Sequence, residues 1–138
     1  NKRVLYGLRI LFFIIQNMKK KILIIEDDTD LQKIYKSYFE KAGLIVTIAD
    51  NGLKWITKIL ENPPDIIMLD VLMPQMNGIE FLETIKNQSS IKIPTVVCSS
   101  LTKQWDIDNI YRLWADLFIN KFEYKIQELV EKVTSYIK

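Results

Sequence analysis

The fold of this chain is decided by the stretch IIMLD at residues 66–70, which is followed by VLMPQMNG at residues 71–78. An apolar run of β-forming residues ends in the carboxylate of Asp70, and a loop with a proline and an Asn-Gly pair comes next. A buried parallel strand delivers an acid in this way to the C-terminal edge of a sheet, where α/β folds place their chemistry. Taken alone, Asp70 would be interpreted as a strand-ending residue that caps a turn.

Two other strand ends change that interpretation. The run ILII at residues 22–25 ends in Glu26, Asp27 and Asp28, and the run TVVC at residues 95–98 ends in a pair of serines. The ends of parallel strands meet at one edge of a sheet, so these polar groups are predicted to form a site there.

Composition limits the class of protein. The chain has 138 residues, of which 49% are hydrophobic and 26% charged, as expected of one globular domain. The net charge is +2, and three basic residues before Met18 leave a charge of −1 for the rest, which gives no indication of a nucleic-acid groove. The single cysteine, Cys98, lies in an apolar strand pattern, which predicts a buried thiol and a reducing, cytoplasmic setting.

The chain has no histidine. This excludes Ser-His-Asp and Cys-His mechanisms, a histidine-ligated zinc and a histidine phosphocarrier. A metal ion here would be a hard cation on oxygen ligands.

Residues 1–17 differ from the remainder. Their apolar positions predict an amphipathic helix, and the fully apolar run 10–15 is too short to span a bilayer. This extension is interpreted as an upstream helix, an artificial leader or a dimer contact, and residues 18–138 are predicted to form the main domain.

Residues 18–138 alternate between strand and helix patterns. This alternation predicts an α/β fold with a doubly wound, flavodoxin-like five-stranded parallel sheet of order 2-1-3-4-5 and five helices. The predicted strands are 22–25, 44–49, 66–69, 93–98 and 116–119. One helix is predicted from Asp30 as its cap until Ala42-Gly43 ends it, and another opens at Gly78 and continues through Ile85. The other helices are predicted at 54–60, about 106–114 and about 124–137.

Three carboxylates, those of Glu26, Asp27 and Asp70, are predicted to converge. Such acids repel one another, and a divalent cation resolves the repulsion; the alternative is a structural cluster with one acid protonated. Lys121 and Ser99 end two further strands and are predicted to face the same pocket. A cation, an ammonium and a hydroxyl around one carboxylate suit an anion attached to that carboxylate, as in phosphoryl transfer.

These residues carry a resemblance. From about Lys20 to Lys138 the chain resembles a response-regulator receiver domain of two-component signalling. The matching pieces are Glu26-Asp27-Asp28 after an apolar strand, Leu69-Asp70 with Met73-Pro74 and Asn77-Gly78, Ser99-Ser100, and Lys121.

The resemblance implies a role for each site residue. Asp70 would be the phosphoacceptor, served by a partner histidine kinase or phosphotransfer protein. Mg²⁺ or Mn²⁺ would be bound by Asp27, Asp70 and the backbone carbonyl of Leu72, with Glu26 acting through water. Beyond self-phosphorylation and slow self-dephosphorylation, the domain would not be an enzyme.

The resemblance also implies a switch. Ser99 and Lys121 would bind the phosphoryl group, and Phe118 would move inward when Ser99 does. The face formed by the fourth helix, the fifth strand and the fifth helix would then change and meet a downstream effector or output domain.

Some positions depart from the family pattern. Phe122 replaces the usual proline, which predicts a trans Lys121-Phe122 bond. Trp114 replaces a usual glycine and, with Trp105, is considered for an apolar patch. Leu72 and Leu101 cannot orient an attacking water, which predicts slow loss of the phosphoryl group.

Other functions remain open. The same fold could be a pseudo-receiver that binds partners independently of phosphorylation, or a small enzyme or flavin carrier. The acidic residues after the first strand would repel a flavin phosphate. A homodimer through the N-terminal extension is also considered.

Overall fold

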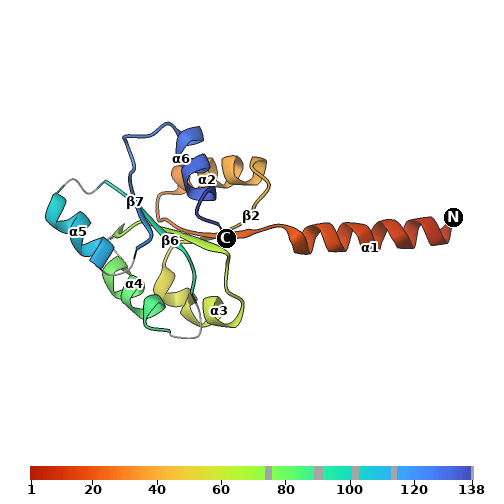
Figure 1. Ribbon diagram of the computed structural model, residues 1–138, viewed down its shortest axis with the longest axis horizontal. Helices are drawn as coiled ribbons and strands as arrows, with labels where there is room; N and C mark the ends of the chain where they lie inside the picture. The colour runs from red at the N-terminus through yellow and green to blue at the C-terminus, as the bar shows by residue number, and fades with distance from the viewer. Residues whose placement is uncertain (74–75, 89–91, 101–102, 113–114, 138) are drawn as a thin grey trace.

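A five-stranded parallel sheet in the order β2-β1-β3-β6-β7 forms the centre of the computed structural model (Figure 1). Counted along this sheet alone, the order is the predicted 2-1-3-4-5. The structure describes residues 1–73, 76–88, 92–100, 103–112 and 115–137. The strands are β1 (Lys21–Ile25), β2 (Ile45–Ala49), β3 (Ile66–Leu69), β6 (Thr95–Ser99) and β7 (Leu117–Asn120).

The register of the two central strands positions the site. All four residues of β3 are buried, as are Ile22 to Ile25 of β1, because helices cover both faces of the sheet. Ile25 pairs with Leu69, so Glu26 and Asp70 leave the sheet at neighbouring points. This places the two carboxylates at one edge, as the sequence predicted.

Helices lie on both faces of the sheet. In Figure 1, α2 and α6 lie on one side and α3, α4 and α5 on the other. Phe39 of α2 and Val133 of α6 are fully buried in one core, and Phe81 of α4 and Ile110 of α5 in the other. The bounds are α2 (Thr29–Lys41), η1 (Gly52–Trp55), α3 (Ile56–Glu61), α4 (Gly78–Lys86), α5 (Gln104–Arg112) and α6 (Ile126–Thr134).

Some predicted details were wrong. Helix α2 is capped by Asp28, whose Oδ1 accepts hydrogen bonds from the backbone N–H groups of Asp30 and Leu31, so Asp30 is not the cap. The predicted helix at 54–60 begins instead as a short 3-10 turn, capped by Asn51. A small antiparallel pair, β4 (Leu72–Met73) and β5 (Met76–Asn77), was not predicted.

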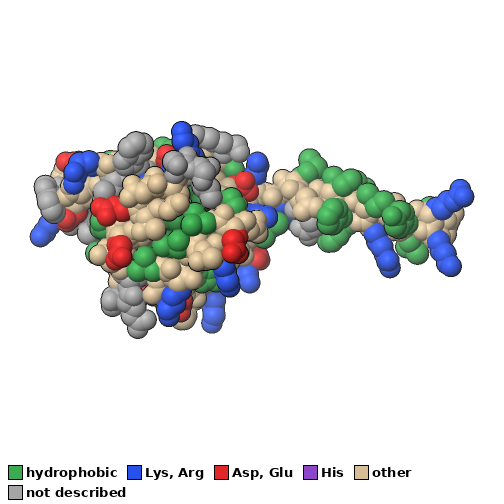
Figure 2. All heavy atoms as spheres, turned by 90° about the horizontal axis from the view of Figure 1, so that it is seen from below, with side chains coloured by type: hydrophobic (Ala, Val, Ile, Leu, Met, Phe, Trp, Pro, Cys, Tyr) green, Lys and Arg blue, Asp and Glu red, His purple; other side chains and the backbone are tan. Residues whose placement is uncertain are grey.

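The described residues form six α-helices, one more than the five predicted for residues 18–138. The sixth is α1 (Lys2–Met18), in the segment for which the sequence predicted a separate amphipathic helix. It projects from the rest of the chain (Figures 1 and 2). Among the described residues, none of the helices combines the length and apolar character needed to cross a bilayer.

Candidate functional site

Asp70 follows the end of β3, and both of its carboxylate oxygens accept hydrogen bonds. Oδ1 accepts from the backbone N–H of Leu72 at 2.9 Å, and Oδ2 accepts from Nζ of Lys121 at 2.8 Å. The Asp70 N–H still donates to the carbonyl of Ile25, which ties the residue to the end of β1. Asp70 is 7% exposed, so the residue is largely buried but still reaches the surface.

Lys121 joins the two buried acids. Its Nζ lies 2.7 Å from Oε1 of Glu26 as well as 2.8 Å from Oδ2 of Asp70. The backbone N–H of Lys121 donates to the carbonyl of Ser99, so β7 delivers the lysine beside the end of β6. The peptide bonds within the described ranges are trans, including Lys121-Phe122, as predicted for a bond without proline.

Burial changes the titration of this cluster. Burial of Glu26 raises the pKa of its carboxyl to about 7; the hydrogen bond from Lys121 opposes the shift and the nearby Asp70 adds to it. Burial also acts to lower the pKa of Lys121, but hydrogen bonds to Asp70 and Glu26 outweigh it, and the pKa is raised. Lys121 is therefore a fixed cation between two acids.

The three predicted acids do converge. One carboxylate oxygen from each of Glu26, Asp27 and Asp70 lies within 4.8 Å of the others, with Asp27 exposed. Oε2 of Glu26 is buried and has no hydrogen-bond partner among the described residues. When all three carboxylates are ionised, the ammonium of Lys121 balances one negative charge and two remain. Carboxylate oxygens with this net charge are suitable ligands for a hard divalent cation.

Ser99 and Phe118 lie on neighbouring strands. Ser99 ends β6, is fully buried, and has an Oγ without a hydrogen-bond partner in the described part of the chain. Phe118 of β7 pairs with Val97, is half-buried, and packs on the core beneath α4 and α5. Its backbone N–H donates to the hydroxyl of Tyr111 on α5. The predicted switch residues thus lie between the acidic cluster and α5.

The loop after Asp70 ends at Gly78, whose backbone lies very close to the backbone of Val71. A Cβ added to Gly78 would lie 2.6 Å from Cα of Val71, a distance that real side chains do not reach. Glycine is therefore required where α4 begins, directly against the loop that carries Leu72. The Leu72 side chain is half exposed.

Several predicted features lie outside the described residues. These are the positions of Leu101 and Trp114 and the side chain of Trp105. Trp55 is half-buried against the core. Cys98 is buried, as predicted, and burial raises the pKa of its thiol to about 11.

Two residues near the site were not identified from sequence. Nε2 of Gln32 on α2 donates to the carbonyl of Glu26 at 2.6 Å and so fixes the start of the acidic loop. Tyr35 on the same helix lies behind the acids with its hydroxyl 3.9 Å from Sγ of Cys98. Their spacing in the sequence resembles that of any helix face, so neither gave a signal.

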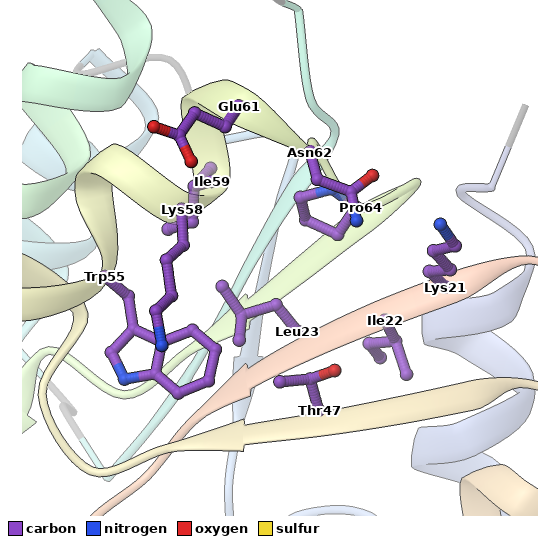
Figure 3. A pocket seen from close by; sticks show the side chains of 10 residues that line it. All are labelled: Lys21, Ile22, Leu23, Thr47, Trp55, Lys58, Ile59, Glu61, Asn62 and Pro64. Atoms are coloured by element: carbon purple, nitrogen blue, oxygen red, sulfur yellow. The ribbon is translucent and has the colours of Figure 1, made fainter.

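A separate hollow of about 310 Å³ opens at the other end of β1 (Figure 3). Lys21 begins this strand, whereas Glu26 follows its end. In the hollow, Nζ of Lys58 lies 4.7 Å from the centre of the Trp55 ring. Its lining is mixed apolar and polar, without a group of converging acids, and it is distinct from the acidic cluster.

Comparison with known proteins is consistent across sequence and structure. The family model described as response regulator receiver domain matches residues 22–134. The response regulator SaeR of Staphylococcus aureus is 31% identical over 116 residues, covering 84% of this chain and 50% of that protein. The chain thus spans about half the length of the curated relatives it matches.

Solved structures agree on the fold. The receiver domain of Francisella response regulator 1452 superposes with a TM-score of 0.77 and 27% identity, covering 86% of this chain and 97% of that one. The BeF3-activated N-terminal receiver domain of Klebsiella pneumoniae RstA gives a TM-score of 0.77 at 21% identity, covering 86% and 98%.

Proposed function

Because this chain belongs to the response regulator receiver domains, we propose that Asp70 accepts a phosphoryl group from a phosphohistidine on a partner kinase or phosphotransfer protein. The observation that carries the proposal is the pairing of Lys121 with both Glu26 and Asp70, with Asp27 beside them. This arrangement places one acceptor carboxylate among groups that stabilise added negative charge.

The transfer itself needs little from the protein beyond positioning and charge. A carboxylate oxygen of Asp70 forms the new P–O bond as the P–N bond of the donor histidine breaks, and the imidazole keeps the electron pair of that bond. Lys121 would then pair with the phosphoryl oxygens. The chain has no histidine, so the donor phosphohistidine would lie outside these 138 residues.

The residues present fit Mg²⁺ or Mn²⁺. Asp27, Asp70 and the carbonyl of Leu72 would bind the ion, with Glu26 acting through water. The ion would supply neutralisation of charge on the transferring group. The unpaired Oε2 of Glu26 and the excess negative charge of the cluster support this assignment.

The switch would act through Ser99 and Phe118. A phosphoryl group brings acceptor oxygens that can draw in the buried, unpaired Ser99 hydroxyl and leave space for Phe118. The face formed by α5, β7 and α6 would change as a result. We expect a downstream effector or output domain to bind this face.

Other properties remain proposals. Since the match covers only about half the length of the curated relatives, their output functions are not assigned to this chain. We expect a cytoplasmic setting, no direct binding of nucleic acid by this domain, and no enzymatic turnover beyond gain and slow loss of the phosphoryl group. No observation favours a pseudo-receiver.

The test is phosphorylation by acetyl phosphate with Mg²⁺, followed by intact-mass spectrometry. We expect one added phosphoryl group on the wild type. No phosphoryl group should be added when Mg²⁺ is chelated before the reaction, and none should be added to Asp70→Asn. Asp50→Asn, an exposed acid at the same sheet edge, is the matched control and should react as the wild type does. Equal labelling of Asp70→Asn, or no labelling of a folded wild type, would contradict the proposal.

A further inference from the structure

Helix α1 (Lys2–Met18) exposes nearly all of its apolar side chains. Their exposed fractions run from 43% for Ile10 to 73% for Met18. A lone 17-residue helix with this surface gains little stability in water, because most helices in proteins are stabilised by packing of an apolar face. The apolar surface of α1 therefore requires a binding partner or an apolar phase that removes it from water.

The charge of this segment is one-sided. Residues 1–21 contain six of the 19 basic residues and none of the 17 acidic ones, and the first acid in the chain is Glu26. The remaining 13 basic and 17 acidic residues give residues 22–138 a formal charge of −4. On the face seen in Figure 2, hydrophobic and basic side chains mark the projecting helix.

Apolar side chains are denser on one side of the helix. At 3.6 residues per turn, six of them form a continuous apolar sector of about 120° that holds no basic residue. The rest of the circumference carries the basic residues of the helix, with further apolar side chains between them: Lys2, Arg3 and Arg9, and Tyr6, Ile10, Phe13 and Ile14. Arg9 is also midway along the helix, which favours an orientation along an interface. The apolar sector consists of Val4, Leu5, Leu8, Leu11, Phe12 and Ile15.

We propose that α1 lies along the surface of an anionic phospholipid membrane. The apolar sector would enter the boundary between headgroups and acyl chains, and the basic residues would contact lipid phosphates. The helix would thereby hold the receiver domain at the membrane surface. This role is independent of phosphorylation at Asp70.

A second copy of the chain is the less suitable cover. Pairing two such helices forms no ion pair between them, because neither helix carries a carboxylate for the basic residues of the other. Anionic lipid headgroups provide that negative charge along the whole helix. Charge complementarity thus selects the membrane over self-association.

The test is flotation of the full chain with phosphatidylcholine vesicles and with vesicles that also contain phosphatidylglycerol. We expect binding to the anionic vesicles, weaker binding at high salt, and little binding to neutral ones. Replacing Arg3 and Arg9 by Gln should weaken binding about 25-fold, at about fivefold per basic residue. Leu8→Gln with Phe12→Gln should abolish it.

The matched control is Lys33→Gln with Lys36→Gln, which makes the same charge change at exposed positions of α2 and should bind as the wild type does. Circular dichroism spectra of the variants should be measured to check that each keeps the domain fold. The proposal is overturned if the chain does not float with anionic vesicles, whether it sediments as a monomer or as a dimer. Equal binding to neutral vesicles, or no effect of removing Arg3 and Arg9, also overturns it.

Discussion

Nζ of Lys121 lies 2.8 Å from Oδ2 of Asp70, although 51 residues separate them in the chain. The same ammonium lies 2.7 Å from Oε1 of Glu26. One cation that follows β7 therefore pairs with two acids, one after the end of β1 and one after the end of β3. The stability of the fold and the titration of Glu26 both depend on this cluster, and each gives a prediction.

Replacement of Lys121 by Met should destabilise the metal-free protein at pH 8. The buried acids would lose their cation, which costs about 3 kcal/mol in free energy of unfolding, measured by urea denaturation. Added Mg²⁺ should reduce this loss, because a divalent cation restores positive charge to the cluster. Lys33→Met, at an exposed position, should change stability by less than about 0.5 kcal/mol. Similar losses in both variants would argue against a buried ion cluster.

The raised pKa of Glu26 predicts a pH dependence of stability. Burial raises this pKa from 4.5 to about 7, so the folded state keeps a proton that the unfolded chain has lost between these values. The folded state then binds more protons, and the free energy of unfolding falls as pH rises through this window.

Comparison with Glu26→Gln isolates this effect. In metal-free buffer, the stability of the wild type relative to Glu26→Gln should fall by about 3 kcal/mol between pH 4.5 and pH 7, at 1.36 kcal/mol per pKa unit. Urea denaturation at a series of pH values measures it. A flat or rising difference would show that Glu26 is ionised throughout.

Gly78→Ala should disturb the loop that carries Leu72. The new Cβ would meet Cα of Val71, so the backbone must shift, at a cost of about 1–3 kcal/mol in stability. The affinity for Mg²⁺ should fall with it. Gly7→Ala is the control, because nothing lies within 4 Å of its added Cβ. Thermal denaturation and Mg²⁺ titration together check both effects; wild-type behaviour of Gly78→Ala would refute the close approach.

Leu72 should slow the loss of the phosphoryl group. Its half-exposed apolar side chain next to the acceptor loop cannot orient a water for attack on phosphorus. Leu72→Asn supplies an amide that can, and should shorten the lifetime several-fold, measured by intact mass after removal of phosphodonor. Leu72→Met keeps the apolar character and should leave the lifetime unchanged. A wild-type lifetime of seconds would contradict this explanation.

The sequence predicted the strands more closely than the helix ends. The strand at 66–69 was placed without error, because four apolar residues between polar loops allow little choice of register. The helix cap was placed at Asp30 and is Asp28, since either acid precedes the same apolar face. Capping depends on backbone angles that the pattern of residue types does not specify.

The sequence by itself determined which residues end the central strands, and hence that Glu26, Asp27 and Asp70 share one sheet edge. Alternating strand and helix patterns were enough, because parallel strands align their ends. Only the tertiary structure decided that Lys121 contacts both Glu26 and Asp70, that Oε2 of Glu26 is left without a partner in the described structure, and that Gly78 meets Val71. These contacts join residues distant in the chain or across a turn, and their distances depend on sheet twist, loop geometry and packing, which local residue patterns do not determine.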